Sequence, residues 1–565
     1  MNNSHEKKWV VSPNVPLEVE AQLGDFPLGL RKLLYNRGIY QESQAIQYLN
    51  SSGPLHDPFL FEDMQKALER IKKAITAQEP IVVYGDYDAD GICATALLVQ
   101  VMQGCGALVT GYIPDRFDEG YGLNEDALKD LFANGTNLVV TVDCGIRSAR
   151  EVEIAQKLGM DLIISDHHYP GSRLPPAYAI INPKNPQEHY PDQYLSGVGL
   201  AYKIAQGLCK MVPDTTIDPN TFIDLVAVGT VADIVPLRGE NRSLVKAGLA
   251  TLRAGKNIGL QSLAEAAGLR ASKLTARDIG FMLAPRLNAA GRLSSARLSY
   301  DLLTASDHQT AKVLANQLDD LNRQRQNLVL DLVSTAQEEI QQQQAMNIVI
   351  SFHQDYHQGL VGLVASRLVD EHYRPAIVGQ VKGEYAVASC RSIPEFHITD
   401  ALDHCADLFV RHGGHEMAAG FTIALENIPE FCQRMQVLAD EKLAGRQLTP
   451  TLRADMEIEL RKVPSDILER IELIEPVGQD NPEVVFISRG VQVLNKKGVG
   501  NEQQHLSLQL KDGQKIYHAI AFRQGHLAKE LPAKIDILYA VTQNDFNGLV
   551  STQLNIKDIK PAANQ

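Results

Sequence analysis

The sequence predicts an α/β protein of several domains: a parallel-sheet domain, a long linking helix, a second α/β domain and a C-terminal all-β barrel. Three observations lead to this fold class. Apolar runs alternate with helical patterns between about residues 56 and 240, as in strands joined by crossover helices. Residues 306–345 contain neither Gly nor Pro and space their apolar residues helically. From about residue 450, short apolar runs alternate with turns.

Residues 1–55 are predicted to form an N-terminal helical cap, because "ESQAIQYLNSS" has helical apolar spacing. The parallel-sheet domain is expected over residues 56–260. Its strands are "IVVYGD", "LVVTVD", "LIISDHH" and "AIIN", and "GICATALLVQVMQG" and "IRSAREVEIAQKLG" are the helices between them. A site in such a sheet is expected beyond the carboxyl ends of the strands, where the polar residues of these segments lie.

A helical region that includes the long helix is expected over residues 261–345. The helix is either an ordinary amphipathic helix or a strut that joins two domains, and its spacing does not decide between them. A second α/β domain begins at "MNIVISFH" and is expected over residues 346–448. Residues 449–565 complete the chain with strands such as "GVQVLNKKGVG" and "HLSLQL", which predict the barrel.

Composition narrows the class of protein. The chain has 565 residues, which is too many for one core, with 44% hydrophobic and 22% charged residues. No apolar stretch approaches the roughly 18 residues of a membrane span, and the N-terminus has no apolar signal core, so we expect a cytoplasmic protein. Seven scattered cysteines are typical of reduced thiols. The net charge of -14 argues weakly against duplex binding, although carboxylates at a metal site would contribute to it.

Residues that can bind metals follow the predicted strands. The set consists of Asp86, Asp88, Asp90, Asp143, Asp166, His167 and His168, with Asp233 at the end of the apolar run in "LVAVGTVADIVPL". Any one of these aspartates is more often a helix cap or turn residue. Together they form a set of carboxylates and imidazoles without cysteine, which suits Mn²⁺ or Mg²⁺ better than structural zinc. A carboxylate shared by two ions would suit two-metal hydrolysis of phosphoesters.

Four segments, in this order and spacing, resemble the motifs of the DHH phosphoesterase superfamily: "GDYDADG", "VTVDCG", "SDHH" and "GTVADIVPL". Further segments resemble the RecJ family within it, whose members are bacterial single-stranded-DNA-specific 5′→3′ exonucleases. They are "RFDEGYGLN", "LSGVGLAYK", "APRLNAAGRL", "GLVGLVASRL", "RHGGHEMAAGF" and "EPVGQDNPEVVF". The likeness covers nearly the whole chain. It implies that the second α/β domain is a DHH-associated domain and that the barrel has the OB fold and binds nucleic acid.

The resemblance implies a set of ligands for two ions of Mn²⁺ or Mg²⁺: Asp88, Asp90, Asp143, His167, His168 and Asp233. Asp143 is our choice for the ligand shared by both ions. Asp166 is expected to orient a neighbouring histidine. Asp86 is either a ligand or a base for the attacking water, and we expect Asp86, Asp143 and His168 to act in catalysis.

The same resemblance implies a phosphate-binding set: Arg116, Arg292, Arg391, Ser392, Gly413, Gly414 and His415. Arginine forks suit a terminal phosphate, and glycine backbone can approach one closely. Taken singly, each arginine could equally be structural, and the glycines could form a simple turn. In "ASCRSI", Ala388 and Cys390 stand where glycine-like residues are expected, which puts the backbone approach beside Arg391 and Ser392 in doubt.

The resemblance implies a monomeric enzyme that degrades single-stranded DNA to mononucleotides in repair and recombination. It also implies single-strand-binding protein and a RecQ-type helicase as partners, and no contact with membranes. Two alternatives stay open. One is the same chemistry on a small substrate such as pyrophosphate, a cyclic dinucleotide or a very short oligonucleotide. The other is a non-catalytic DNA-binding relative, which would be expected to have lost metal ligands, whereas all four motifs are intact here.

Overall fold

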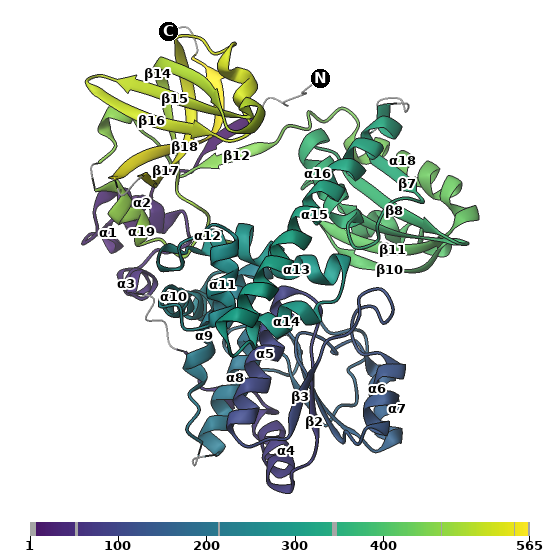
Figure 1. Cartoon of the computed structure of the whole chain (residues 1–565). Helices are drawn as coiled ribbons and strands as arrows, with labels where there is room; N and C mark the ends of the chain where they lie inside the picture. Colours follow the sequence, from purple (N-terminus) through teal and green to yellow (C-terminus); the bar gives the residue numbers. More distant parts are fainter. Residues whose placement is uncertain are drawn as a thin grey trace.

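The computed structural model describes residues 7–50, 55–212, 215–341, 347–464, 466–546 and 549–562. Figure 1 shows the first α/β domain at the bottom and the helical region above it, with the barrel and the second α/β domain as two separate upper lobes. In the described ranges, no helix is both long and apolar enough to cross a bilayer.

The first domain is built on a five-stranded sheet in the order β3-β2-β4-β5-β6, with all strands parallel. The strands are β2 (Ile81–Tyr84), β3 (Val109–Tyr112), β4 (Leu138–Thr141), β5 (Asp161–Ser165) and β6 (Ala179–Ile181). The four predicted strands are present. The edge strand β3 escaped prediction because only Val109 of its four residues is buried, so its apolar pattern is weak.

Helices cover both faces of this sheet, which is why β2 and β4 are buried throughout. One face packs on α4 (Met64–Ala77), α5 (Ala89–Gly104) and α8 (Gly197–Met211), and the other on α6 (Glu125–Ala133) and α7 (Ala149–Leu158). In this sheet β3 lies on one side of β2, and the next strand along the chain, β4, lies on the other side of β2. The carboxyl ends of β2 and β4 therefore form a topological switch point, where parallel α/β sheets bind ligands.

The helical region contains one correction to the sequence prediction. We expected a strand before Asp233, but residues Ile223–Ala232 form helix α9, and Asp233 is its C-cap. Eight of the ten residues of α9 are buried, because it packs between α5, α8 and α10 (Gly239–Arg253). A helix buried all round has a continuous apolar sequence, and its periodicity then cannot be distinguished from that of a buried strand.

Behind α9 and α10, shorter helices complete the helical region. They are α11 (Ile258–Ala266), α12 (Ala276–Asp278), a π-helical turn (Ile279–Leu283), α13 (Ala284–Leu293) and α14 (Arg297–Leu303).

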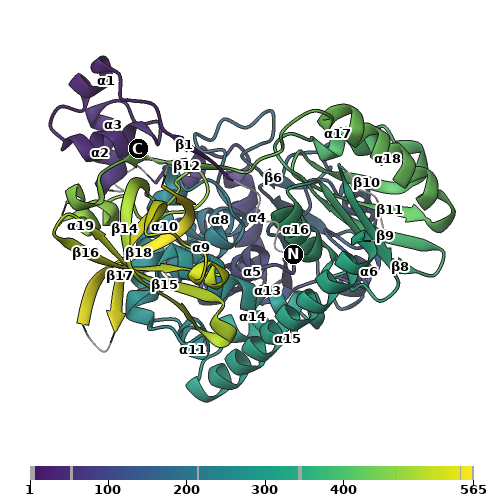
Figure 2. The ribbon, with the colours of Figure 1, turned by 90° about the horizontal axis from the view of Figure 1, so that it is seen from above.

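Helix α15 (His308–Gln341) joins two domains, as the strut interpretation proposed. Its 34 residues span about 50 Å. Ala311, Ala315 and Leu318 near its start pack in the core of the first domain, whereas Val333 and Ala336 near its end pack in the second α/β domain. Figure 2 shows α15 running along one side of the molecule.

The second α/β domain has a five-stranded sheet in the order β10-β11-β9-β8-β7, in which only β7 and β8 are parallel. Its elements are β7 (Val349–His353), α16 (Val361–His372), β8 (Ala376–Lys382), β9 (Tyr385–Arg391), α17 (Ile398–Asp403), β10 (Phe409–His415), β11 (Ala418–Ala424) and α18 (Ile428–Leu443). Ala388 and Cys390 point into the core from β9, while Ser389 and Arg391 alternate with them and face Gly362 of α16. Ala388 and Cys390, which stand where glycine-like residues were expected, therefore lie on the face of β9 opposite to Arg391.

The barrel consists of β14 (Val485–Val499), β15 (His505–Asp512), β16 (Lys515–Ala521), β17 (Lys534–Phe546) and β18 (Leu549–Pro561). Its strand order β14-β15-β16-β18-β17 closes because β17 pairs back with β14. The short strand β13 (Met456–Glu457) adds a parallel partner to β14.

The N-terminal segment covers the barrel, a location that the sequence left open. Strand β1 (Lys8–Val11) pairs in parallel with β12 (Thr451–Ala454), next to the helices α1 (Leu17–Gln22), α2 (Leu28–Tyr35) and α3 (Glu42–Asn50). Leu30, Leu33 and Leu34 share one core with Phe486 and other barrel residues. The first and the last described elements, β1 and β18, therefore both belong to the barrel lobe, as Figure 1 shows.

Candidate metal centre

Four separate segments bring the predicted ligands to the switch point of the first sheet. Asp86 and Asp88 lie in the turn after β2, Asp90 in the first turn of α5, Asp143 directly after β4, the triplet Asp166–His168 after β5, and Asp233 at the end of α9. The structure forms three groups of three residues, in each of which one potential ligand atom per residue lies within 4.8 Å of those of the other two. These groups are Asp86, Asp88 and Asp143; Asp143, His167 and His168; and Asp90, His167 and Asp233.

Asp143 occupies the middle of the cluster, and its side chain is fully enclosed. It is 2% exposed and belongs to two of the three groups. Its Oδ1 lies 3.1 Å from Nε2 of His167, which is also 3.4 Å from Oδ2 of Asp233. Helix α8 can approach Asp143 this closely because residue 197 is a glycine. A Cβ at Gly197 would lie only 2.6 Å from the Cβ of Asp143. The backbone of Asp143 is left-handed, with φ at 64°, a region that Asp and Asn enter more readily than most residues.

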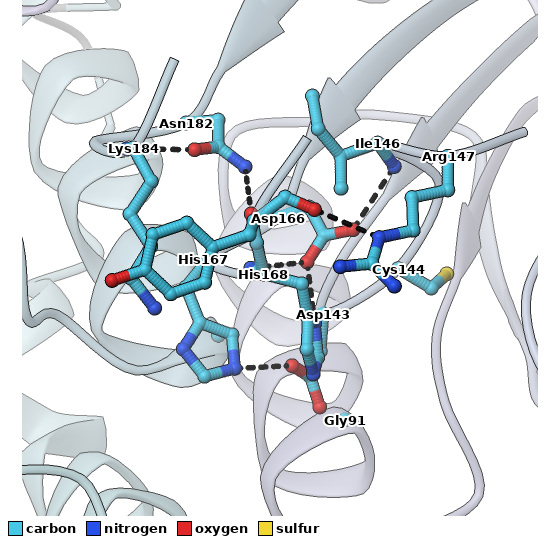
Figure 3. Close-up of polar contacts among 12 residues, drawn as sticks. Gly91, Asp143, Cys144, Ile146, Arg147, Asp166, His167, His168, Asn182 and Lys184 are labelled. Atoms are coloured by element: carbon cyan, nitrogen blue, oxygen red, sulfur yellow. Dashed lines mark hydrogen bonds and ion pairs between the residues drawn. The ribbon is translucent and has the colours of Figure 1, made fainter. Parts of the chain in front are cut away.

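Asp166 contacts His168 and belongs to none of the three groups. Its Oδ1 accepts a hydrogen bond from the backbone N–H of His168 (3.0 Å) and lies 2.8 Å from Nδ1 of the same residue, while Oδ2 accepts one from the backbone of Ile146 (3.0 Å). Figure 3 shows the Asp166 carboxylate between these partners. Burial alone would raise its pKa, but the hydrogen bonds and charge of His168 hold the pKa of Asp166 below its usual value. This contact leaves Nε2 as the ring nitrogen of His168 available to a metal.

Asp88 and Asp90 also cap helices, which was the alternative interpretation of these residues. Oδ1 of Asp88 accepts hydrogen bonds from the backbones of Asp90 (2.9 Å) and Gly91 (3.2 Å) at the start of α5. Both oxygens of Asp90 accept backbone N–H groups at the start of α8, from Gly197 (2.7 Å) and Val198 (3.0 Å). Capping and metal binding are compatible, because a carboxylate oxygen has more than one lone pair.

The cluster gathers several buried carboxylates whose negative charges oppose one another. Burial, together with the neighbouring carboxylates, raises the pKa of Asp86 and Asp143 well above the usual value and that of Asp233 to about 9. Burial also lowers the pKa of His167 to about 3, so its ring is neutral. Four buried atoms of this cluster have no hydrogen-bond partner among the described residues: Oδ1 of Asp86, Oδ1 of Asp143, and Nδ1 and Nε2 of His167. Unpaired oxygen and imidazole atoms of this kind fit Mn²⁺ or Mg²⁺.

The metal-free protein should lose stability as the pH rises from about 6.5 to 9. Asp90 and Asp233 have pKa values raised to about 7 and about 9, against about 3.9 when unfolded. The folded state therefore binds more protons than the unfolded state in this window, and stability falls with rising pH. His167, whose pKa is lowered in the folded state, makes stability rise with pH. This opposing effect acts only below the unfolded-state pKa of histidine, about 6.5. Thermal unfolding in EDTA at several pH values measures this slope.

Saturating Mg²⁺ should reduce or reverse that slope, because the ion neutralises the carboxylates and binds their deprotonated form. Asp233→Asn should flatten the slope without metal. A melting temperature in EDTA that stays constant or rises over this window would show that the carboxylates have ordinary pKa values.

Beside the candidate metal ligands, the structure collects four arginines, one more than the sequence predicted. Burial lowers the pKa of Arg292 to about 9, and the charges of Arg116, Arg325 and Arg391 add to this effect. The guanidinium of Arg116 lies 4.1 Å from the ring centroid of Tyr87, and Nη1 of Arg292 donates to the backbone carbonyl of Gly359 (3.0 Å). Nε of Arg116 and Nε of Arg325 are buried without a partner among the described residues. Such a group of cations is suited to an anion.

The other predicted phosphate ligands divide into two kinds. Ser392 is buried, and its hydroxyl donates to the carbonyl of Phe396 (2.5 Å), so this donor is already used. Gly413, Gly414 and His415 lie on the edge strand β10, rather than in a turn before a helix. Burial lowers the pKa of His415, and the charges of Arg147, His168 and Lys184 lower it further.

Three residues near the cluster were missed by sequence reasoning. Arg325 lies in "DDLNRQRQ" of α15, where its neighbours suggested a solvated face. Tyr121 places its hydroxyl 3.1 Å from Nδ1 of His168. Lys184 follows β6, where no motif pointed to it. Tyr121 could have been found, because it lies within "RFDEGYGLN", one of the segments that carry the family likeness.

Sequence profiles of three known domains match this chain. The DHH family N-terminal domain matches residues 80–230, the DHHA1 domain residues 345–440 and the RecJ OB domain residues 454–558. These matches cover the first α/β domain, the second α/β domain and the barrel, respectively.

Named relatives are similar over almost the whole chain. The single-stranded-DNA-specific exonuclease RecJ of Bacillus subtilis is 36% identical over 95% of this chain and 68% of its own length. The RecJ proteins of Dickeya dadantii and Escherichia coli are each 34% identical, over 96% and 95% of this chain and 98% and 96% of their own lengths.

Solved structures agree with these matches. The crystal structure of RecJ from Thermus thermophilus in complex with Mn²⁺ has a TM-score of 0.83 and 29% identity, covering 98% of this chain and 80% of that one. The complex of the same protein with Mg²⁺ has a TM-score of 0.77 and 27% identity, covering 98% and 79%. With three matching domains in the same order and more than 30% identity to RecJ proteins over nearly its full length, this chain belongs to the RecJ family of DHH phosphoesterases.

Proposed function

We propose that this protein is a metal-dependent exonuclease that degrades single-stranded DNA from its 5′ end to mononucleotides, in DNA repair and recombination. The observation that carries the proposal is the position of four arginines beside a buried cluster of carboxylates and histidines whose atoms are close enough to hold metal ions. One half of this arrangement suits the hydrolysis of a phosphodiester, and the other half suits a terminal phosphate.

The residues that would hold the ions are Asp88, Asp90, Asp143, His167, His168 and Asp233. When bound, two divalent ions activate a water molecule and neutralise charge on the phosphate that is attacked. Asp143 and His167 each belong to two of the three groups. Asp143 is the shared ligand in this proposal, since a carboxylate has two oxygens for two ions, whereas a neutral imidazole offers one nitrogen lone pair. Asp166 holds the ring of His168 in place through its two contacts.

Asp86 can serve as a base in this arrangement. Its Oδ1 has no hydrogen-bond partner among the described residues, and burial beside Asp88 raises its pKa well above the usual value. A carboxylate with a raised pKa accepts a proton from water more readily than an ordinary one. Its membership of the group with Asp88 and Asp143 also supports a role as a ligand, and both roles place it at the attacking water.

The arginines would select the end of the strand. A 5′-phosphate carries more negative charge than an internal phosphodiester, so it gains more from four neighbouring guanidinium groups. Arg292 is held by Gly359 and Arg391 by the carbonyl of Cys390 (2.8 Å), so contacts with the second α/β domain fix both side chains. Tyr87 supports Arg116 in the same way.

The barrel would guide the rest of the strand, as OB folds do. Its aromatic side chains differ in availability: Phe522 is 52% exposed, whereas the hydroxyl of Tyr517 donates to the carbonyl of Leu460 (3.1 Å). Phe522 is therefore our choice for a base-stacking residue. By family relationship we further propose a cytoplasmic monomer that works with single-strand-binding protein and a RecQ-type helicase.

The test uses oligonucleotides labelled at the 5′ or the 3′ end, a closed circular single strand, duplex DNA, pyrophosphate and a cyclic dinucleotide, each with and without Mn²⁺. We expect the linear single strand alone to be degraded, with labelled mononucleotide released first from the 5′ end. Cleavage of the circle, or first release from the 3′ end, would refute the proposed polarity. Faster hydrolysis of pyrophosphate or the cyclic dinucleotide would instead establish a small-substrate enzyme.

A further inference from the structure

The turn after β6 brings a lysine to the metal centre that the mechanism above does not use. The backbone N–H of Lys184 donates to Oδ1 of Asn182 (2.7 Å), and Nδ2 of Asn182 donates to the carbonyl of His168 (3.0 Å). Asn182 is fully buried. Figure 3 shows this chain of contacts from Lys184 through Asn182 to His168. The position of Lys184 is therefore tied to the turn that carries two of the candidate metal ligands.

The side chain of Lys184 is half-buried and has no ion-pair partner within 4.0 Å in the described part of the chain. Its ammonium lies 4.8 Å from the ring centroid of Tyr169, the residue that follows His168. Burial lowers the pKa of Lys184, against the attraction of Asp233 and Asp166. A cation that is partly removed from water, supported by an aromatic ring and without a paired carboxylate, is suited to a phosphate oxygen.

Lys184 lies at the opposite end of the carboxylate cluster from the arginines. Arg116 and Arg292 lie beside the turn after β2, because Arg116 stacks on Tyr87 and a Cβ at Gly291 would lie 2.7 Å from the carbonyl oxygen of Tyr87. Lys184 is tied to the turn after β5 through Asn182 and His168, and β4 lies between β2 and β5 in the sheet. A second cation lies on the same side, because Nε of Arg147 donates to the carbonyl of Tyr169 (2.8 Å), whose ring contacts Lys184. If the arginines hold the 5′-phosphate and the ligand cluster holds the scissile phosphate, a strand continues towards Lys184.

We propose that Lys184, supported by Tyr169, binds a non-bridging oxygen of the phosphate that follows the scissile linkage on its 3′ side. This inference rests on the proposed function and extends it by one subsite. It explains how a strand that has just lost a nucleotide stays at the metal centre, since the next phosphate is already held by a fixed cation.

The test combines protein variants with substrates in which one linkage is a neutral methylphosphonate. Lys184→Gln should lower kcat/KM on an ordinary 5′-phosphorylated strand by about ten- to a hundredfold, the range of one charge-assisted hydrogen bond. Wild-type protein should lose a similar factor when the second linkage is neutral. Lys184→Gln should lose little more on that substrate, because the partner of Lys184 is already absent.

Three further variants separate this role from a structural one. Lys184→Arg should recover most of the rate, and Tyr169→Leu should lose less than Lys184→Gln, with the same dependence on the second linkage. Lys66→Gln is the matched control, since Lys66 lies 5.1 Å from the ring centroid of Tyr178 at the start of β6, the other end of that strand. It should leave every rate unchanged. Thermal unfolding confirms that each variant is folded.

The outcomes are distinct. Coupling between Lys184 and the second linkage supports the subsite. An equal loss for Lys184→Gln on all substrates, or coupling to the third or fourth linkage in its place, overturns it. Failure of the wild-type protein to degrade any single strand would refute the proposed function itself and is read from a separate lane of the same assay.

Discussion

Replacing Asp143 with Asn should reduce the hydrolysis of single-stranded DNA by at least about a thousandfold, while the protein stays folded. The expected loss corresponds to about 4 kcal/mol of transition-state stabilisation, the scale expected when a shared metal ligand is removed. Asn has nearly the shape of Asp and tolerates the left-handed backbone, so the change removes charge with little strain. Initial rates on a 5′-labelled strand at saturating Mn²⁺ measure the effect.

Asp480→Asn is the matched control for this variant. Asp480 is exposed and also has a left-handed backbone, with φ at 58°, but it lies outside the three groups of candidate ligands. The Asp480→Asn variant should degrade the single strand at the rate of the wild-type protein. Calorimetric titration with Mn²⁺ should show weakened binding for Asp143→Asn alone. Retention of more than about a tenth of the wild-type rate, a loss below about 1.4 kcal/mol, would exclude Asp143 from the metal centre.

Arg292→Ala should reduce the preference for a 5′-phosphorylated end by about ten- to a hundredfold, the range of one charge-assisted fork. The measurement is the ratio of kcat/KM for strands with a 5′-phosphate and a 5′-hydroxyl. Cleavage of a strand that is already bound should change less, because Arg292 faces the terminal phosphate in our proposal. The change should also not destabilise the protein without DNA, since it removes one of four mutually repelling cations.

Arg297→Ala is the control for Arg292→Ala. Arg297 begins the next helix, α14, and pairs with exposed Asp301 at 2.7 Å, an interaction of small energetic weight. It should leave the ratio for the two ends unchanged. An unchanged ratio for Arg292→Ala would remove this residue from the end-binding site, and the same substitution at Arg325 would then show whether the fourth arginine takes that role.

Much of the metal centre could be predicted because parallel strands place their carboxyl ends along one edge. Asp86, Asp143 and His167 follow buried strands, and each strand is marked by a short run of β-branched residues. The structure brings Asp233 into the cluster, although the apolar run before it, which we expected to be a strand, is a helix enclosed on all sides.

The residues that escaped prediction depend on contacts between distant segments. Arg325 is far in sequence from Arg116, Arg292 and Arg391, and only the packing of α15 places it among them. Lys184 lies in an ordinary turn, and its importance comes from Asn182 and Tyr169, which hold it beside the ligands. Charged residues of this kind look like surface residues in the sequence, because burial and neighbouring charge are properties of the fold.

The packing of the N-terminal helices on the barrel has a consequence for how the chain is made. Leu30, Leu33 and Leu34 are synthesised early, yet their partners Phe486, Leu508 and Ile556 emerge from the ribosome last. At about 5–20 residues per second, a chain of 565 residues takes about half a minute to two minutes to complete. During that time the apolar face of α2 lacks its native partners, while the first α/β domain can already fold. The two ends of the chain should therefore be the last unit to become protected from proteolysis during synthesis, and the most dependent on chaperones.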